Sequence, residues 1–156
     1  MRRHASIVLV MGWLMVAFGH VALANLAKEE AIKKGRAKYQ GIWRVIALEV
    51  DGKKVPEKDA KKITVTNHAD GTWIIKVDGK EVSQGTSKID PTQKPKTIDF
   101  TPTIGADKGK TFLGIYEING QTRKLCFASP GKDRPTEFSA QPGSGQILVV
   151  FQRETK

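Results

Sequence analysis

The segment of this chain that looks most like a ligand-binding motif is Gly105–Thr111, which reads Gly-Ala-Asp-Lys-Gly-Lys-Thr. A phosphate-binding loop needs four residues between its two glycines and a helix after its Lys-Thr pair, because the backbone must wrap around the phosphates. Here Ile104 stands where the first glycine would have to be, and Phe112–Tyr116 has the composition of a strand. We therefore expect a Gly-rich loop between two strands and no bound nucleotide.

The other side chains that could do chemistry are few and scattered. After residue 24 there is one histidine, His68, in an expected turn, and one cysteine, Cys126, in an expected apolar strand. A metal site or a nucleophilic triad needs several such side chains brought together. The carboxylates of Asp99, Glu117 and Glu137 have no spacing that would pair them. We expect a protein that is not an enzyme and that uses no metal or other cofactor, with Cys126 buried as a small hydrophobic side chain.

The N-terminus has the three parts of a secretory signal. Arg2–His4 is basic, Ile7–Phe18 is an uninterrupted apolar run, and Ala22–Ala24 supplies the small residues of a cleavage site. The alternative is an uncleaved anchor, because Ala5–Ala24 is nearly long enough to span a bilayer. We expect residues 1–24 to be removed as a signal peptide, and the remainder to be exported to the periplasm or the cell exterior without a membrane span.

The charge of the chain bears on its partners. Its 26 Lys and Arg residues against 16 Asp and Glu residues give a net charge of +10, and the signal segment holds two of the basic residues and none of the acidic ones. The exported protein therefore stays basic, which favours anionic cell-envelope surfaces but is equally consistent with a Lys-rich surface that only confers solubility. Basic residues do not alternate with aromatic ones at stacking intervals, so nucleic acid is not an expected partner. We expect a monomer.

A short helix is expected at the start of the exported chain, in residues 25–40. Glu29-Glu30 precedes Lys33-Lys34 by four residues, which stabilises a helix over Leu26–Lys38 by a few tenths of a kcal/mol per pair. From Gly41 onward, β-branched and aromatic residues occur in short runs between Gly, Pro, Asn and Asp. We therefore expect residues 41–156 to form one all-β domain.

Three dipeptides mark tight hairpins: Asp51-Gly52, Asp78-Gly79 and Asn119-Gly120. A type I′ turn needs positive φ at both central residues, which Gly, Asn and Asp tolerate best. A two-residue turn also sets the register of its strands. Around Asn119-Gly120, this places Tyr116 opposite Arg123 on an aromatic face that points inward. In the hairpin at Asp78-Gly79, the expected inner face carries Trp73, Ile75, Val82 and Gln84.

In the hairpin at Asp51-Gly52, the sequence gives conflicting indications of which face points inward. Opposition of Glu49 to Lys54 marks their face as the solvent side, and strict alternation then turns Trp43 outward. Either a β-bulge between Trp43 and Glu49 reverses the alternation, or the N-terminal helix covers Trp43 from outside.

The expected fold class is all-β: an antiparallel up-and-down barrel of about eight strands, preceded by a short N-terminal helix. Short sequential connections are typical of such a barrel, and an antiparallel sandwich is the alternative. The longest connection, Ser129–Ser144, is expected to be an ordered flap anchored by Phe138. The expected strands lie near Ile42–Val50, Ile63–Thr66, Trp73–Val77, Val82–Ile89, Thr97–Thr101, Phe112–Ile118, Thr122–Ala128 and Gln146–Phe151.

A barrel of eight strands can be filled by side chains or can hold one small ligand. Gly85 and Gly114 would leave room on the inner wall, so one hypothesis is an apolar pocket for a small apolar or amphipathic ligand. Tyr116 and Arg123 would lie at one mouth, where Arg123 would neutralise an anionic head group or, alternatively, only extend to solvent. The competing hypothesis is a structural or interaction module with a filled barrel and a basic outer surface. The candidate ligand-binding residues are Trp73, Phe100, Tyr116, Arg123 and Phe127.

Gly41-Ile42-Trp43, which opens the first expected strand, resembles the G-x-W start of lipocalins, and Arg153 stands where those barrels place an Arg on the Trp ring. Most of the exported chain is similar to a family of small secreted lipocalin-like domains of unknown function, abundant in planctomycete bacteria. This resemblance implies an exported lipocalin-like barrel over residues 41–156, with Gly41, Trp43 and Arg153 closing one end, and it implies no substrate. The stretches that carry it are Gln40–Val45, Leu48–Lys53, Lys96–Phe100, Gly109–Tyr116, Cys126–Ala128, Arg134–Phe138 and Gln146–Arg153.

Overall fold

The computed structural model describes the backbone of residues 8–155 and the side chains of residues 21–155. Most of the expected signal peptide, residues 1–24, therefore lies outside the part whose side chains are described. No helix within the described residues is both long enough and apolar enough to cross a membrane.

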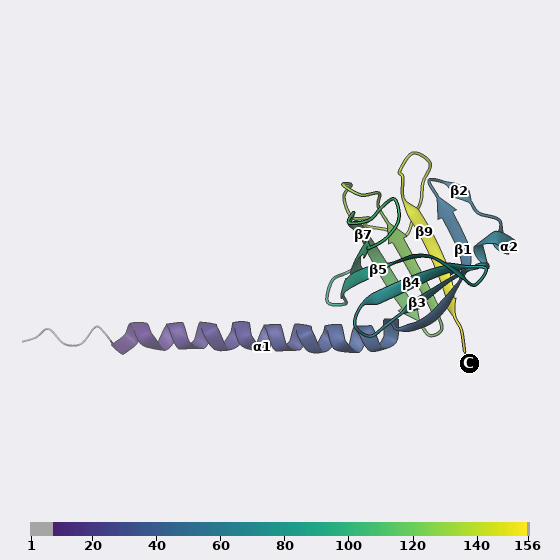
Figure 1. Ribbon diagram of the computed structural model, residues 1–156. Coiled ribbons are helices and arrows are strands. Elements are labelled where there is room, and N and C mark those ends of the chain that lie inside the picture. Colours follow the sequence, from purple (N-terminus) through teal and green to yellow (C-terminus); the bar gives the residue numbers. More distant parts are fainter. Residues whose placement is uncertain (1–7, 156) are drawn as a thin grey trace, which may run out of the picture.

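The strands form one closed antiparallel barrel (Figure 1). From β3 to β9 each strand pairs with the next, and β1 pairs with both β3 and β9, which closes the sheet with eight strands. The predicted barrel is confirmed, and β2 is an additional short strand beside β1. The elements are α1 (Val8–Tyr39), β1 (Gly41–Val50), β2 (Lys53–Lys54), α2 (Glu57–Ala60), β3 (Ile63–Asn67), β4 (Thr72–Val77), β5 (Lys80–Asp90), β6 (Lys96–Pro102), β7 (Phe112–Asn119), β8 (Thr122–Phe127) and β9 (Ile147–Arg153).

Helix α1 ends at Tyr39, one residue beyond its expected end, but it begins well before the expected start at Leu26. It projects from the barrel as an arm and reaches it only with its last turns (Figure 1). The amide of Gln40 donates to the carbonyl of Arg36, and Gly41 then leaves the helical conformation with φ of +121°. Because Tyr39 is buried, the end of the helix is part of the barrel core.

Two of the three predicted turns have the expected conformation. Asp51 and Asp78 have φ of 50° and 49°, and each is followed by a glycine with positive φ, as a type I′ turn requires. The third turn is displaced by one residue. Asn119 pairs with Thr122, so Gly120 is the first central residue, with φ of 59°, as in a type II′ turn.

The displaced turn changes the register of β7 against β8, but it does not change which face of the hairpin points into the barrel. Tyr116 lies opposite Leu125 and not opposite Arg123 as predicted. Because the partner moves by two residues, Tyr116 and Arg123 still share one face of the hairpin, which points into the barrel. All three side chains are buried.

The inner face predicted for the β4–β5 hairpin is partly wrong, because a β-bulge shifts the register of β5 against β4. Lys76 pairs with Glu81 as expected, but Ile75 pairs with Ser83, which leaves Val82 without a partner. Val82 is 54% exposed, and Gln84 pairs with Ile74 and not with an inward-facing residue, so both are outer residues. No turn signal could indicate this bulge, because it lies within the paired strands.

Trp43 points into the barrel, as the bulge hypothesis predicted. The register of β1 against β9 shifts between Val45 and Ala47. Trp43 and Val45 are buried before the shift, and Leu48 packs against the core after it. The bulge thus keeps apolar residues inside on both sides of Ile46.

Arg134 ties the loop that joins β8 to β9, residues 128–146, to strands β6 and β7. The Arg134 Nη1 atom donates to the carbonyl of Gly114 at 2.7 Å and to that of Ile98 at 3.2 Å. The same atom lies 2.6 Å from the carboxylate of Asp99. Phe138, the predicted anchor, is only half-buried.

Candidate functional site

The barrel interior is not completely filled. A cavity of about 270 Å³ remains between the inward-facing residues. Its walls are mostly apolar side chains from β1, β3, β4, β6, β8 and β9, and Tyr39 of α1 and Ser87 of β5 also line it. An engineered apolar cavity of about 150 Å³ holds a benzene molecule, so the space here is sufficient for a small organic ligand.

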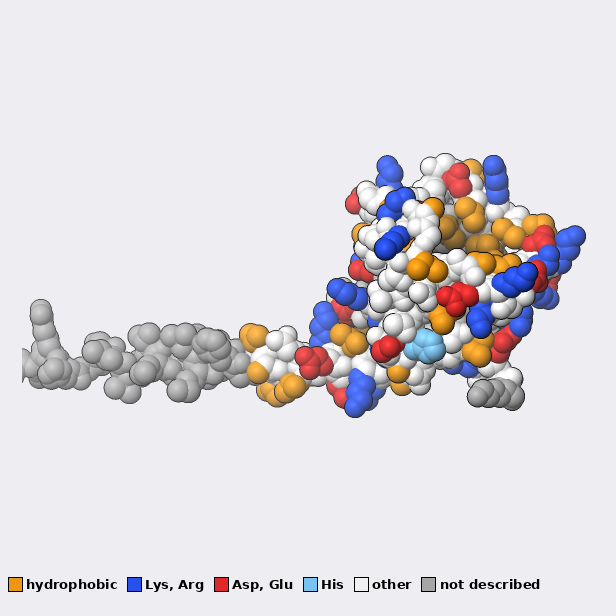
Figure 2. Space-filling view, viewed as in Figure 1, with side chains coloured by type: hydrophobic (Ala, Val, Ile, Leu, Met, Phe, Trp, Pro, Cys, Tyr) orange, Lys and Arg blue, Asp and Glu red, His pale blue; other side chains and the backbone are white. Residues whose placement is uncertain are grey.

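The cavity opens at the end of the barrel away from α1. Half-buried Leu48, Ile63, Val77 and Ile147 line it there, near the ends of their strands. Hydrophobic side chains can be seen in a hollow in this part of the surface (Figure 2). A ligand could therefore enter without disturbing α1.

The opposite end is closed by Trp43, Arg153 and Gly41, the three residues that the resemblance indicated. The guanidinium carbon of Arg153 lies 4.1 Å from the centroid of the Trp43 ring. Its Nη1 and Nη2 atoms donate to the carbonyls of Gln40 and Lys38 at 2.6 and 2.5 Å. A Cβ on Gly41 would lie 2.6 Å from Arg153 Nη1, so only glycine leaves space for this guanidinium.

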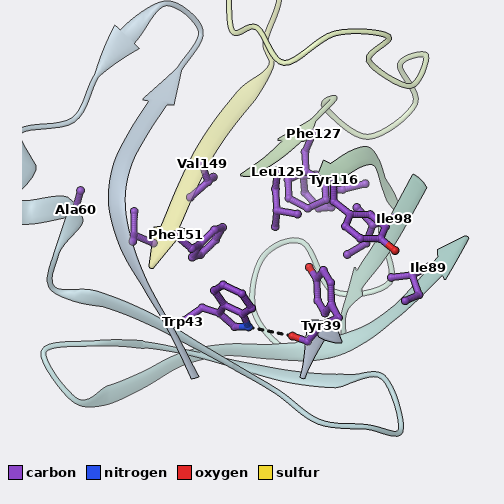
Figure 3. Close-up of a cluster of buried hydrophobic side chains, with 12 residues drawn as sticks. Tyr39, Trp43, Ala60, Ile89, Ile98, Tyr116, Leu125, Phe127, Val149 and Phe151 are labelled. Atoms are coloured by element: carbon purple, nitrogen blue, oxygen red, sulfur yellow. Dashed lines mark hydrogen bonds between the residues drawn. The ribbon is translucent and has the colours of Figure 1, made fainter. Parts of the chain in front are cut away.

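The end of α1 forms the floor of the cavity. The Trp43 Nε1 atom donates to the carbonyl of Tyr39 at 2.9 Å, and the Tyr39 ring projects into the barrel beside Tyr116 (Figure 3). Arg36 donates to both the hydroxyl and the carbonyl of Ser87 on β5, the hydroxyl at 3.0 Å. These contacts hold the last helical turn against the barrel.

Arg123 lies deep in the barrel and lines the cavity at its α1 end. It is 1% exposed, so it neither lies at a mouth nor reaches solvent, and both sequence-based hypotheses about its position are wrong. Its guanidinium carbon is 4.5, 4.6 and 4.3 Å from the ring centroids of Tyr39, Trp43 and Phe151. Burial lowers the pKa of Arg123 to about 10, so the side chain is still charged at neutral pH.

Four of the five candidate ligand-binding residues line the cavity, namely Trp73, Phe100, Arg123 and Phe127. Phe100 contacts Trp73 and Phe127 edge-on, with ring centroids 5.7 and 4.5 Å apart. Tyr116 does not line the cavity. It packs edge-on against Tyr39, with centroids 5.4 Å apart, and burial raises its pKa to about 12.

The two glycines expected to leave room do not create the cavity. A Cβ on Gly114 would lie 2.4 Å from the Phe127 ring, and one on Gly85 would lie 2.5 Å from the Trp73 ring. Aromatic rings therefore already occupy the space above each glycine. The cavity owes its volume to short inward side chains elsewhere, such as Val65 on β3.

Three polar residues that line the cavity, Tyr39, Asn67 and Ser87, were not among the predicted ligand-binding residues. The expected strand ends at Thr66, but β3 extends to Asn67, and the side chain of Asn67 is buried. Ser87 is two residues from Gly85 on β5, so strand alternation could have identified it as inward-facing. Tyr39 belongs to the helix, and no local pattern could indicate that it would enter the barrel.

The other side chains considered for chemistry do not form a site. Asp99 pairs with Arg134, Glu117 pairs with Lys124, and His68 is exposed. The segment Gly105–Thr111 is an exposed loop before β7, as predicted. Among the described residues, no three His, Cys, Asp or Glu side chains come together as metal ligands.

The outer wall carries a second hollow, of about 480 Å³, beside α2 and strands β1, β3 and β4. Its charged lining consists of Arg44, Lys58, Lys61, Lys62 and Lys76, with the carboxylates of Asp78 and Glu154. Cations are therefore in excess in this basic groove.

Comparisons with protein-family models, curated proteins and solved structures found no match to this chain. The similarity to secreted lipocalin-like domains therefore stays a prediction.

Proposed function

We propose that this protein is an exported, non-catalytic binding domain whose barrel holds one small apolar or amphipathic ligand. The observation that carries the proposal is the cavity of about 270 Å³, which has apolar walls and opens at one end. Export is supported by the signal pattern of residues 1–24.

The volume and the lining support binding in different ways. The volume is slightly below the usual range for drug-sized ligands, which is about 300–1,000 Å³, so the ligand is small. The apolar walls favour transfer of an apolar group from water by roughly 25 cal/mol per Å² of buried surface. The few polar side chains at the α1 end would orient an amphipathic ligand.

A pair of substitutions on β9 tests this proposal. Val149 lines the cavity, and the neighbouring Val150 belongs to the opposite face of the same strand. Val149→Phe should fill part of the cavity and reduce binding, whereas Val150→Phe is the matched control and should leave it unchanged. Binding of an environment-sensitive apolar dye and of medium-chain amphiphiles can be measured by fluorescence, with circular dichroism to verify that each variant is folded.

Native mass spectrometry of the protein purified from its own host provides a test that needs no variant. We expect a reproducible small adduct that is lost on unfolding. An adduct-free protein that also fails to bind the dye and the amphiphiles would contradict the proposal.

The basic groove supports a second candidate function, contact with anionic cell-envelope surfaces. Lys58 and Lys76 line the groove, and neither has an ion-pair partner among the described residues. Exposed charges of this kind attract anionic surfaces in a salt-dependent manner. Sedimentation with vesicles of anionic or neutral lipid would test it, because Lys58→Gln/Lys76→Gln should weaken binding to the anionic vesicles alone.

A further inference from the structure

The structure leaves one buried cation without an anion. Arg123 is 1% exposed, and its Nε and Nη1 atoms have no hydrogen-bond partner. None of the ion pairs among the described residues includes it. Three aromatic rings lie against the guanidinium, but a guanidinium directs its N–H groups outward in its own plane, where only acceptor atoms can satisfy them.

A second donor at the same end of the cavity also lacks an acceptor. The Asn67 side chain lines the cavity and is 7% exposed, and its Nδ2 atom has no hydrogen-bond partner. Asn67 lies on β3 opposite Gly41 of β1, at the end of the barrel where α1 joins. Buried polar groups are nearly always hydrogen-bonded, so two side chains with unpartnered donors on one cavity indicate a missing acceptor.

We propose that the ligand of the barrel is a small monocarboxylic acid, which enters carboxylate first and is held by Arg123 and Asn67, with its apolar tail toward the open end. This inference rests on the proposed function and specifies the ligand class. A carboxylate supplies the acceptor oxygens and the single negative charge that Arg123 lacks. A dianion such as a phosphate monoester would leave one charge unpaired in an apolar cavity, which is costly.

The size of the acid follows from the cavity volume. Benzene has six non-hydrogen atoms and occupies an engineered cavity of about 150 Å³, so by proportion a volume of about 270 Å³ holds roughly eleven such atoms. Nonanoic acid has this size. Longer acids would have to leave part of the tail outside the barrel.

The decisive experiment compares ligands that share a tail and differ in the head group. Nonanoate, 1-nonanol and nonylamine are titrated into the full chain by calorimetry at neutral pH. We expect nonanoate to bind at least about tenfold more tightly than 1-nonanol, and nonylamine to bind least, because its charge repels Arg123. In Arg123→Met the preference for the acid should disappear, whereas Arg123→Lys should retain part of it.

The outcomes separate this inference from the proposed function. If 1-nonanol binds as tightly as nonanoate, the carboxylate assignment is wrong although the pocket binds ligand. If none of the three ligands binds, both proposals are wrong. An affinity that keeps rising with acid length up to hexadecanoate would overturn the size argument. The wild-type comparison is decisive even if Arg123→Met does not fold.

Discussion

Arg153 offers the sharpest test of how the barrel is closed, because a single side chain joins the last strand, the first strand and the end of α1. In Arg153→Ala, the cation–π contact with Trp43 is lost, worth about 0.5–1 kcal/mol at a partly exposed site. The hydrogen bonds to the carbonyls of Lys38 and Gln40 are also lost, worth roughly 1–2 kcal/mol together, since water can replace the donor there.

The free energy of unfolding should therefore fall by about 1.5–3 kcal/mol. For a domain of this size, each kcal/mol changes the melting temperature by roughly 3–5 °C, so we expect Tm to decrease by about 5–15 °C. Differential scanning calorimetry measures this directly. Tryptophan emission of the folded state should also move to longer wavelength, because Trp43 loses the group that covers its ring.

Two control variants distinguish the proposed contacts from a general effect of charge. Arg153→Lys keeps the charge but lacks the planar fork, and should lie between wild type and Arg153→Ala. Lys88→Ala removes an exposed charge on β5 and should change stability by less than about 0.5 kcal/mol. A Tm of Arg153→Ala within about 2 °C of wild type, with unchanged emission, would refute this account of barrel closure.

Two further predictions concern titratable groups. The Lys28 ammonium and the Thr92 hydroxyl lower the pKa of the Asp90 carboxyl below its ordinary value of 3.8. The resulting stabilisation is present above about pH 4 and is lost as the pH falls further, so urea unfolding of Asp90→Asn should show a smaller loss of stability below pH 4 than wild type; identical pH profiles would contradict this. Cys126 is fully buried and burial raises the pKa of its thiol, so a thiol reagent should modify it only as fast as the protein unfolds. Complete reaction of the folded protein within seconds would show that the thiol is accessible.

Much of the barrel could be derived from local sequence patterns. Asp-Gly dipeptides indicate type I′ turns because few other residues tolerate positive φ at both central positions, and Asp51 and Asp78 adopt it. Strand alternation has a period of two, so it identifies the inward face even where the register is displaced, as at Tyr116. The conflict between Trp43 and Glu49 left two alternatives, a bulge or a covering helix, and the register shift in β1 shows that the bulge is correct.

A bulge or a turn position could not be predicted where the neighbouring residues all agree on which face points inward. Val82 looks like an inner residue in the sequence, and its exposure depends on how β4 and β5 are paired along their full length. The turn at Gly120 was predicted one residue early because Asn119-Gly120 and Gly120-Gln121 are both acceptable turns. Longer-range pairing with β9, where Arg153 donates its amide to the carbonyl of Gln121, stabilises the observed choice.

Part of the candidate site was likewise predictable from the sequence, and part was not. The sequence by itself determined the chemical character of the barrel interior, because strand alternation identifies Trp73, Phe100 and Phe127 as inward-facing residues. Only the tertiary structure decided that the interior keeps a cavity and that Arg123 reaches its closed end without an anion. A cavity is a small difference between two large volumes, the space inside the closed sheet and the summed side chains. It depends on which residues from distant strands meet, and that is settled only when β1 closes against β9 and Tyr39 enters the barrel.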